Sequence, residues 1–541
     1  MTHAENLPFR SRRAPVRSLR GSVATSQPLA AQAGLEILMT GGNAADAAVA
    51  TAAALAVTEP TGTGPGGDCF ALFYESATRR VRALNGSGRA PAALSIGVLA
   101  DRGIEGEIPL SSPHAVTVPG TVAGWEDTLA EWGTLAFVDV LRPAIRLAEE
   151  GFPVSGLIAA YWAEEAAKLR LTARGSELLK DGRAPRAGEI WRNPGLAGVL
   201  RTLCEGGAAA FYEGDPGRAI VRAVREAGGL IEESDLADHE STLEEPLHTT
   251  YRGVTAYACP PNGQGLATLL SLNILEGFEL AGLDPLSAEH LHYSIEAMRL
   301  GFADARWHVA DPAVSDQPVA ALLSKEYGSA RRVLIDPRAA TLTHLPGEPN
   351  AAGSDTVYLA VVDREGNACS FINSNYAGVG TGIVPEGMGF PLQNRGANFS
   401  LDPGHPNALA GRKRPYHTIM PGLATDASGE LFACFGVKGG FMQPQGQLQV
   451  LVNLVDHRMD PQDALDRPRF CLRPALPSGD VALEVGIPVE TMHALARMGH
   501  RVIPSTDRFL FGTGQVILRD PAEGAFWAGS DPRADGAAVG W

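Results

Sequence analysis

The sequence predicts a mixed α and β protein in which helices and strands dominate different parts of the chain. Three observations support this: an alanine-rich helical stretch near the N-terminus, a mostly helical pattern from about residue 120 to 335, and short strands with Gly and Pro turns after residue 356. At 541 residues, the length allows two to four domains or one large body. The composition, 45% hydrophobic and 20% charged, is that of a globular protein with a sizeable core.

The N-terminal region combines a basic arm with two helices. The arm covers residues 1–20 and is expected to be loosely ordered, and the first helix, over 27–39, ends at two glycines. Asn43 can cap the second helix, which runs to Val57. Its residues are small and apolar on nearly every face, so we expect this helix to be buried with a sheet packed closely against it.

The stretch from Gly62 to Gly67 fits the pattern G-x-G-x-x-G of dinucleotide-binding loops. That function needs a strand before the glycines and a helix after them. Here a helix comes first and a strand over 69–74 follows. Pro65 also removes one of the backbone N–H groups that such a loop would use. We therefore reject a dinucleotide site.

Charge and cysteine usage exclude several classes of partner. The formal net charge of -16 argues against nucleic acid and anionic membranes. The six cysteines show neither CxxC spacing nor a histidine cluster, which excludes the usual zinc motifs and fits a reduced compartment. The N-terminus lacks the apolar core of a secretory signal, and the longest apolar stretch, 44–57, is too short to span a membrane. We expect a cytoplasmic protein that needs no metal or other cofactor.

The most informative stretch is the strand entry at Asp355-Thr356. A polar run over 335–355 leads into an apolar run over 356–362, and a Gly-Asn turn and a second apolar run complete a hairpin. Exposed loop ends are where chains are cut. A cut before Thr356 would create an N-terminal threonine carrying hydroxyl and amine together. Local signals alone favour an ordinary strand residue, because threonine is common in strands.

Several short motifs occur along the chain in an order shared with one known family. They are Gly41-Gly42-Asn43-Ala44-Ala45-Asp46-Ala47, Val57-Thr58-Glu59-Pro60 with Gly66-Gly67, Val118-Pro119-Gly120-Thr121-Val122-Ala123-Gly124, Leu272-Asn273-Ile274-Leu275-Glu276-Gly277-Phe278, Glu296-Ala297-Met298 with Phe302-Ala303-Asp304, Asp363-Arg364-Glu365-Gly366-Asn367, Lys413-Arg414-Pro415, Gly439-Gly440 and Ser530-Asp531-Pro532-Arg533. Together they resemble the γ-glutamyltransferase (γ-glutamyltranspeptidase, glutathione hydrolase) family from about residue 20 to the C-terminus.

The resemblance implies the α+β fold of the N-terminal-nucleophile (Ntn) hydrolases. This αββα sandwich has two stacked, mainly antiparallel sheets between helical layers. Members of the family are made as one precursor that cuts itself into two chains. Here the cut would fall between Asp355 and Thr356, giving a large chain of residues 21–355 and a small catalytic chain of residues 356–541. The two chains are expected to form a heterodimer, and whether heterodimers pair further stays open.

The resemblance also assigns the catalytic residues. Thr356 is the expected nucleophile, and its own α-amine, with an unperturbed pKa of roughly 7.7–8.0, can be the base. A His/Asp triad is therefore not required. Ser374, 18 positions later, is expected to orient the nucleophile. The backbone N–H groups of Gly439 and Gly440 are expected to form the oxyanion hole.

Around the acyl site the sequence departs from the family pattern. The Arg that grips an α-carboxylate in the transpeptidases is Ser87 here, and a serine cannot supply a charged, bidentate fork. The acid that binds the α-amine is Asn398, which keeps an acceptor but loses the charge. The candidate substrate-binding residues in this sequence are Ser87, Arg89, Asn375, Arg395, Asn398, His417 and Thr418.

These departures all change the charge of the expected acyl site in the same way. The loss of an acid and the presence of Arg395, with Lys438 beside the glycine pair, disfavour a free α-amine and favour an anionic acyl group. Oxamate-like, glutaryl and other dicarboxylic-monoamide substrates fit, as in the amidohydrolase and acylase branch of the family (oxamate amidohydrolases and related cephalosporin acylases). The alternative for both cations is pairing with acidic residues, without substrate contact.

We therefore expect an autoprocessing amidohydrolase or acyltransferase that acts on a small-molecule amide with an anionic acyl group. The acyl-enzyme would be resolved by water or by an amine. Two alternatives remain: a true γ-glutamyltransferase or glutathione hydrolase, and an uncleaved, non-catalytic family member that binds a ligand.

Overall fold

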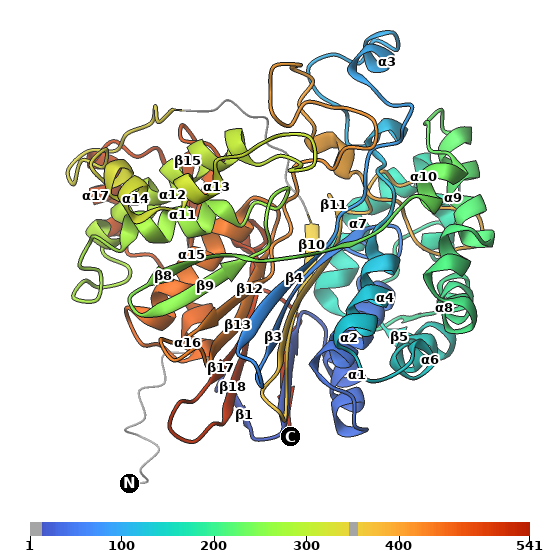
Figure 1. The fold of residues 1–541 in the computed structure, drawn as a ribbon, viewed down its shortest axis with the longest axis horizontal. Coiled ribbons are helices and arrows are strands. Elements are labelled where there is room, and N and C mark those ends of the chain that lie inside the picture. Colours follow the sequence, from blue (N-terminus) through green and yellow to red (C-terminus); the bar gives the residue numbers. More distant parts are fainter. Residues whose placement is uncertain (1–12, 173, 346–354) are drawn as a thin grey trace.

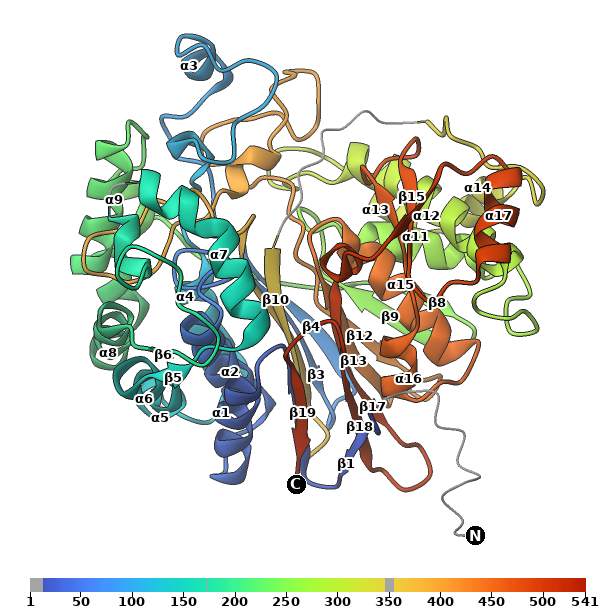
Figure 2. The same cartoon turned by 180° about the vertical axis from the view of Figure 1, so that it is seen from behind.

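Two antiparallel sheets lie face to face between two layers of helices, as Figure 1 and the reverse view in Figure 2 show. The computed structural model describes residues 13–172, 174–345 and 355–541, and for Asp355 and Thr356 it describes the backbone only. This is the αββα sandwich of the Ntn hydrolases that the resemblance implies.

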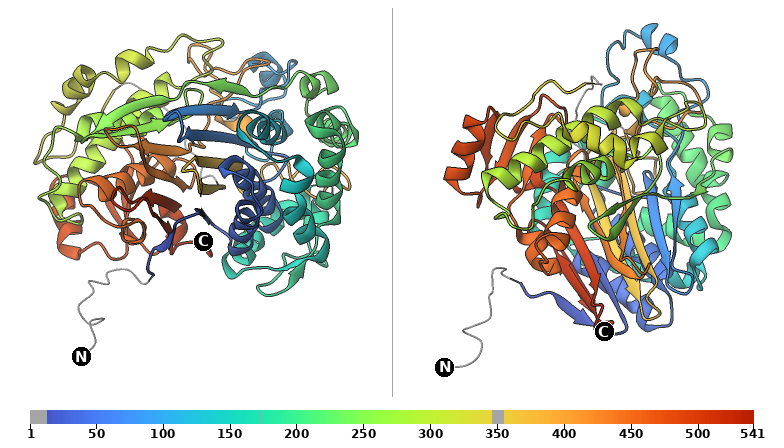
Figure 3. Two further views of the ribbon diagram at one scale, coloured as in Figure 1. Left: turned by 60° about the horizontal axis from the view of Figure 1, so that its bottom comes forward. Right: turned by 60° about the vertical axis from the view of Figure 1, so that its left-hand side comes forward.

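Each sheet combines strands from distant parts of the sequence. The strand order of the first sheet is β1 (Val16–Ser18), β18 (Phe526–Ser530), β17 (Thr513–Arg519), β13 (Leu431–Lys438), β12 (Gly422–Thr425), β9 (Val254–Ala258) and β8 (Leu247–Tyr251). The order of the second is β19 (Ala537–Gly540), β2 (Gly21–Thr25), β10 (Asp355–Asp363), β11 (Ala368–Tyr376), β3 (Asp68–Glu75), β4 (Arg80–Gly86) and β7 (Thr242–Glu244). Figure 3 shows the C-terminus beside the first strands, where β19 pairs with β2.

Alternation along β10 explains how this strand serves two cores. Val357, Leu359 and Val361 pack into the core under the first helical layer. Tyr358 and its alternate neighbours Ala360 and Val362 pack into the core between the sheets. Successive side chains of a strand point to opposite faces, so a strand buried on both faces is apolar throughout.

The first helical layer covers the sheet that contains β10. Its helices are α1 (Pro28–Met39), α2 (Ala44–Thr58), α4 (Thr121–Trp132), α5 (Phe137–Val140), α6 (Arg142–Glu150), α7 (Gly156–Leu171), α8 (Pro194–Tyr212), α9 (Asp215–Glu226) and α10 (Glu233–Ala237). Helix α2 is buried along its whole length, as predicted. The Asn43 side chain accepts the N–H groups of Ala45 and Asp46, and Asp46 accepts the N–H of Asn43, so a capping box starts this helix.

The second helical layer covers the sheet that contains β13. Its helices are α11 (Leu266–Leu275), α12 (Ala288–His308), α13 (Val319–Leu322), α14 (Lys325–Arg332), α15 (Met442–Val455), α16 (Pro461–Asp466) and α17 (Val489–Arg497). Smaller elements are α3 (Ile96–Ala100), the sheet of β14 (Phe470–Arg473), β15 (Asp480–Glu484) and β16 (Val502–Ser505), and the pair β5 (Phe152–Pro153) and β6 (Ile190–Trp191). No helix in the described part of the chain is both long and apolar enough to cross a membrane.

Two local expectations differ from the structure. The region from 120 to 335, predicted to be mostly helical, also contains β7, β8 and β9, whose short buried-and-exposed alternation is easily overlooked between long helices. The basic arm, expected over residues 1–20, is partly strand: β1 pairs with β18, and the guanidinium of Arg17 lies 4.3 Å from the ring centroid of Trp527. This stacking gives a basic residue a partner at the edge of the sheet.

Candidate active site

Strand β10 begins at the predicted cleavage point. Asp355 lies opposite Tyr376 in β11, and Val357 lies opposite Asn373, so the register shifts between them. Thr356 is therefore in an irregular stretch of backbone at the start of the strand. The side chains of Asp355 and Thr356 lie outside the described part of the structure, so the cut and the nucleophile stay predictions.

The hydroxyl of Ser374 is held beside this strand entry. The residue is fully buried near the end of β11. Its Oγ accepts the N–H of Tyr376 at 2.9 Å and the Nη2–H of Arg395 at 3.1 Å. A hydroxyl oxygen has two acceptor sites, so two accepted bonds also fix the direction of its O–H. Ser374 thus has one orientation, at the place where an orienting hydroxyl is predicted.

Tyr376 has an unusual backbone conformation. Its φ is 80°, in the left-handed region that bulky side chains rarely adopt. The guanidinium carbon of Arg395 lies 4.6 Å from the centroid of its ring. Such backbone strain concentrates at functional sites, where the surrounding contacts hold it. At Tyr376 this backbone conformation ends β11, and the residue lies directly opposite Asp355 at the start of β10.

Arg395 is a fully buried cation in a short 3₁₀ turn over Arg395–Asn398. Its Nη1 donates to the Oγ1 of Thr418 at 2.6 Å, while Nη2 donates to Ser374. Within the described residues no carboxylate forms an ion pair with it, although the charge of Asp68 is close enough to act on its pKa. Burial lowers the pKa of Arg395 to about 10, so the guanidinium stays protonated at neutral pH.

Asp68 and His417 form a second buried pair. The Nε2–H of His417 donates to Asp68 Oδ2 at 3.0 Å, because the Nδ1 atom accepts the N–H of Ile419 at 3.3 Å. Burial, followed by the charge of Arg395, lowers the pKa of His417 to about 3, so this ring is neutral. Burial would raise the pKa of Asp68, but the hydrogen bond from His417, the charge of Arg395 and the hydrogen bond from Gln393 together bring it below its usual value. His417 is thus bound to a protein carboxylate.

The glycine pair joins β13 to α15 in a turn. Gly439 and Gly440 have φ of 127° and 57°, values that favour glycine. Their carbonyls are taken: Gly439 O accepts the N–H of Met442 at 2.9 Å, and Gly440 O accepts the Nε2–H of Gln264 at 2.9 Å. Neither N–H donates to another described residue. Such donors can bind an oxyanion.

The other candidate substrate-binding residues lie in different environments. Ser87 is fully buried, and its Oγ accepts the Nδ2–H of Asn262 at 3.0 Å. Arg89 is half-buried and donates to the carbonyl of Glu240 at 3.5 Å. Both side-chain polar atoms of the buried Asn375 lack a hydrogen-bond partner within the described residues. A buried amide in this state is a place where a substrate or water group would fit.

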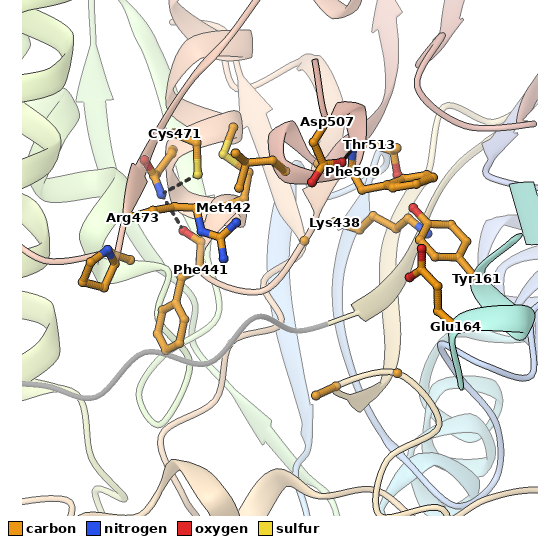
Figure 4. A pocket seen from close by; sticks show the side chains of 18 of the residues that line it. Tyr161, Glu164, Lys438, Phe441, Met442, Cys471, Arg473, Asp507, Phe509 and Thr513 are labelled. Carbon is orange, nitrogen blue, oxygen red and sulfur yellow. Dashed lines mark hydrogen bonds between the residues drawn. The ribbon is translucent and has the colours of Figure 1, made fainter. Parts of the chain in front are cut away.

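A cavity of about 880 Å³ opens beside the glycine pair (Figure 4). Gly439 is in its wall, and Tyr161, Lys438 and Phe509 lie together at one end. The Nζ of Lys438 is 3.5 Å from Glu59 Oε2 and 5.5 Å from the centroid of the Tyr161 ring. Lys438 is therefore paired with an acid, as one of the two interpretations of this cation requires.

A second cavity, of about 1320 Å³, lies beside Tyr376. Asn398, whose Nδ2 has no partner within the described residues, is in its wall. Leu110 borders both cavities, so the two open spaces are neighbours. Arg395, Ser374, His417 and Thr418 line neither cavity, and all four are fully buried.

One group of described residues has the spacing of metal ligands, namely His292, Glu296 and His500, whose ligand atoms lie within 4.8 Å of one another. The Nδ1 of His292 and the Nε2 of His500 are hydrogen bonded to each other at 2.8 Å. The Nε of Arg299 lies 3.2 Å from Glu296 Oε1, where it would repel a metal ion. We interpret this group as a buried charge network between α12 and the turn that follows α17.

Sequence reasoning missed two residues that organise the site. Asp68 begins β3, where its Oδ1 accepts the N–H groups of Gly88 and Gly120 at 3.0 and 3.1 Å. Gln264 links the candidate substrate-binding residue Thr418 to the glycine turn, because its Nε2 donates to the carbonyls of both Thr418 and Gly440. The sequence did contain a signal for Asp68, because this acid stands directly between Gly66-Gly67 and an apolar strand.

The stacked sheets, the strand that begins at a candidate nucleophile and the glycine turn beside it define an Ntn hydrolase. The family model described as Gamma-glutamyltranspeptidase matches residues 30–541. The chain belongs to the γ-glutamyltranspeptidase family. It is an enzyme of the kind that hydrolyses amide bonds or transfers acyl groups from them.

Relatives with several specificities are similar over nearly the whole chain. The Bacillus subtilis (strain 168) glutathione hydrolase-like YwrD proenzyme is 38% identical over 95% of this chain and 97% of its own length. The oxamate amidohydrolase proenzyme of Klebsiella pneumoniae is 34% identical over 97% of this chain and 99% of its own. The crystal structure of cephalosporin acylase from Bacillus halodurans matches with a TM-score of 0.91 and 43% identity, covering 100% of this chain and 99% of that one.

Proposed function

We propose that the chain cuts itself between Asp355 and Thr356, and that Thr356 then attacks an amide carbonyl. The position of Thr356 at the start of β10, beside the oriented hydroxyl of Ser374, supports this assignment. Two of the relatives above are described as proenzymes, which also supports processing. A threonine hydroxyl is inert at its own pKa and needs a base, and the new α-amine is a base in direct reach.

The proposed reaction balances without a cofactor. The Thr356 amine takes the proton of Oγ as Oγ bonds to the carbonyl carbon, and the N–H groups of Gly439 and Gly440 bind the resulting oxyanion. The carbon–nitrogen bond then breaks, and the leaving amine takes the proton. Water, deprotonated by the same amine, attacks the acyl ester, releases the carboxylic acid and restores the hydroxyl. An amine in place of water would give transfer.

We assign an acyl group that is anionic and has no free α-amine. The observation that carries this assignment is the position of Arg395, whose buried guanidinium lies between Ser374 and Thr418. A substrate ammonium placed beside this charge would be repelled, and Asn398 offers no compensating carboxylate. The names of the oxamate amidohydrolase and cephalosporin acylase relatives agree with such a substrate class.

Hydrolysis of a γ-glutamyl amide such as glutathione is the second candidate. The 38% identity to a glutathione hydrolase-like proenzyme is the observation that favours it. The two candidates differ in one chemical group, because a γ-glutamyl group is a glutaryl group with an α-ammonium added.

The experiment is therefore a matched pair of chromogenic substrates. We expect the purified, cleaved enzyme to hydrolyse glutaryl-p-nitroanilide with a kcat/KM above that for γ-glutamyl-p-nitroanilide. Rapid turnover of the γ-glutamyl compound with an inert glutaryl compound would establish the second candidate instead. Release of p-nitroaniline in the presence and absence of an added amine, with product analysis, separates transfer from hydrolysis.

We further propose that the chains 21–355 and 356–541 stay together as a heterodimer in the cytoplasm. In the sheet that contains the site, β2, β3 and β4 belong to the first chain, while β10, β11 and β19 belong to the second. Separating the chains would break ladders such as β10 with β2 and β11 with β3. The six cysteines are unpaired thiols, which supports a reducing compartment.

A further inference from the structure

The first cavity, whose wall contains Gly439, also has two aromatic side chains in contact with each other. Tyr161 of α7 and Phe509 both line it, with their ring centroids 4.5 Å apart and their planes tilted by 48°. Both residues are half-buried, and Figure 4 shows them together at one end of the cavity. Half-buried rings in the wall of a cavity offer apolar surface to a bound molecule.

The backbone around Phe509 is joined to the glycine turn. Phe509 lies in a 3₁₀ turn over Arg508–Phe511, where its N–H donates to Asp507 Oδ1 at 3.0 Å. Strand β17 begins two residues after this turn and pairs with β13, which ends one residue before Gly439. The two turns are in close contact, because a Cβ on Gly439 would lie 3.2 Å from the Cα of Gly512. Phe509 therefore has a set position relative to the expected oxyanion donors.

The position of this cavity identifies the half of an amide substrate that it takes. Its described wall contains Gly439 but none of the candidate substrate-binding residues. Asn398, which is one of those candidates, lines the second cavity. The acyl and amine halves of an amide extend from the carbonyl in opposite directions. We therefore place the amine half in the first cavity, beside the aromatic rings.

The charged side chains of this wall favour an amine half without charged substituents. Lys168 pairs with Glu165 at 2.8 Å, and Lys438 pairs with Glu59 at 3.5 Å, so acids already neutralise both cations. The other charged residues that line the cavity are exposed, so water screens their charges; they are Glu164, Arg473 and Asp507.

We propose that Phe509, in contact with Tyr161, determines leaving-group specificity by packing against a planar aromatic group on the amine half of the substrate. This inference rests on the proposed amide hydrolysis and names the class of amine that is released. A planar ring can stack on Phe509 or meet it edge to face, the two arrangements that aromatic pairs prefer. A saturated ring of the same size gains only contact area.

The test compares glutaryl benzylamide with glutaryl cyclohexylmethylamide, whose amine halves differ in the planarity of one six-membered ring. Phe509→Leu should lower kcat/KM for the benzylamide roughly 3- to 10-fold, the loss expected for an aromatic pair, and leave the cyclohexylmethylamide value nearly unchanged. Phe509→Tyr should retain the benzylamide value. The matched control is Phe278→Leu, because the Phe278 ring stacks on Tyr293 at 4.2 Å but lines neither cavity. An equal effect of Phe509→Leu on both substrates would overturn the proposal.

Binding of 7-amino-4-methylcoumarin, a fluorescent aromatic amine, separates this proposal from the proposed function. In fluorescence anisotropy on the purified protein, we expect wild type and Phe278→Leu to bind it equally, and Phe509→Leu to bind it roughly 3- to 10-fold more weakly. If binding depends on Phe509 but no glutaryl amide is hydrolysed, the hydrolase assignment fails and the aromatic site stands. Equal binding by wild type and Phe509→Leu, or no binding by either, would refute the aromatic site, whatever the activity.

Discussion

The Nη2 of Arg395 donates to the Oγ of Ser374 over 3.1 Å, so a buried cation holds the hydroxyl beside the entry of β10. The same guanidinium donates from Nη1 to Thr418 and lies against the ring of Tyr376. Because Arg395 lines neither cavity, it is placed to act through Ser374, as a positioning residue.

Replacing Arg395 should therefore affect turnover more than substrate binding. Arg395→Lys keeps a cation but loses the two-pronged donation to Ser374 and Thr418. We expect kcat for glutaryl-p-nitroanilide to fall roughly 10- to 100-fold with KM nearly constant, and self-cleavage to slow in parallel. The control is Arg412→Lys, whose ion pair with Asp238 is exposed at the surface. A rise in KM alone would instead show that Arg395 binds the acyl group directly.

The glycine turn gives a second prediction. A Cβ added at Gly439 would lie 3.2 Å from the Cα of Gly512. The substituted residue would also have to adopt a φ of 127°, which disfavours any side chain. Gly439→Ala should displace the N–H groups of the turn and lower kcat about 100-fold or more, as removal of an oxyanion donor does. Gly429→Ala, in a hairpin turn with a φ of 83°, should lower stability but leave kcat unchanged. Similar kcat values for both variants would exclude an oxyanion role.

Acid should destabilise the folded protein through His417. Burial and the nearby Arg395 lower the pKa of this ring to about 3, against about 6.5 in an unfolded chain. Between these values the unfolded chain binds a proton that the folded chain does not, so stability is fully present above pH 6.5 and falls as the pH falls. From pH 6.5 to 5 the loss is about 2 kcal/mol, at 1.36 kcal/mol per pH unit.

The measurement is urea unfolding of the cleaved protein at pH 7 and pH 5. His417→Gln keeps a donor toward Asp68 but cannot be protonated, so the free energy of unfolding should change less with pH in this variant. The exposed His493→Gln is the control and should behave as wild type. An unchanged pH dependence in His417→Gln would mean that this ring is not neutral in the folded state.

Thr356 variants should separate processing from folding. Thr356→Ala removes the hydroxyl, so the precursor should stay intact and be inactive while circular dichroism shows a folded protein. Thr356→Ser retains a hydroxyl and should keep some of both cleavage and activity. Cleavage of Thr356→Ala at the wild-type rate would show that another group performs the cut.

Local patterns predicted the elements whose signals are local. Asn43 before an alanine-rich run predicted a capped, buried helix, and α2 has both features. The hairpin of β10 and β11 followed from two apolar runs around a Gly-Asn turn. Strands β8 and β9 escaped detection because each has five residues and lies between helical segments.

The site depended on tertiary placement that no local pattern contains. The pairing of Lys438 with Glu59 joins residues 379 positions apart, and the sequence alone left that pairing open.

The most direct test of the central claim is mass spectrometry with N-terminal sequencing of the purified protein. We predict two fragments, the smaller of which begins at Thr356 with the sequence TVYLAVVD and has the mass of residues 356–541. An intact chain of 56.8 kDa after prolonged incubation, or a small fragment that begins at any other residue, would contradict the assignment of Thr356 as an N-terminal nucleophile.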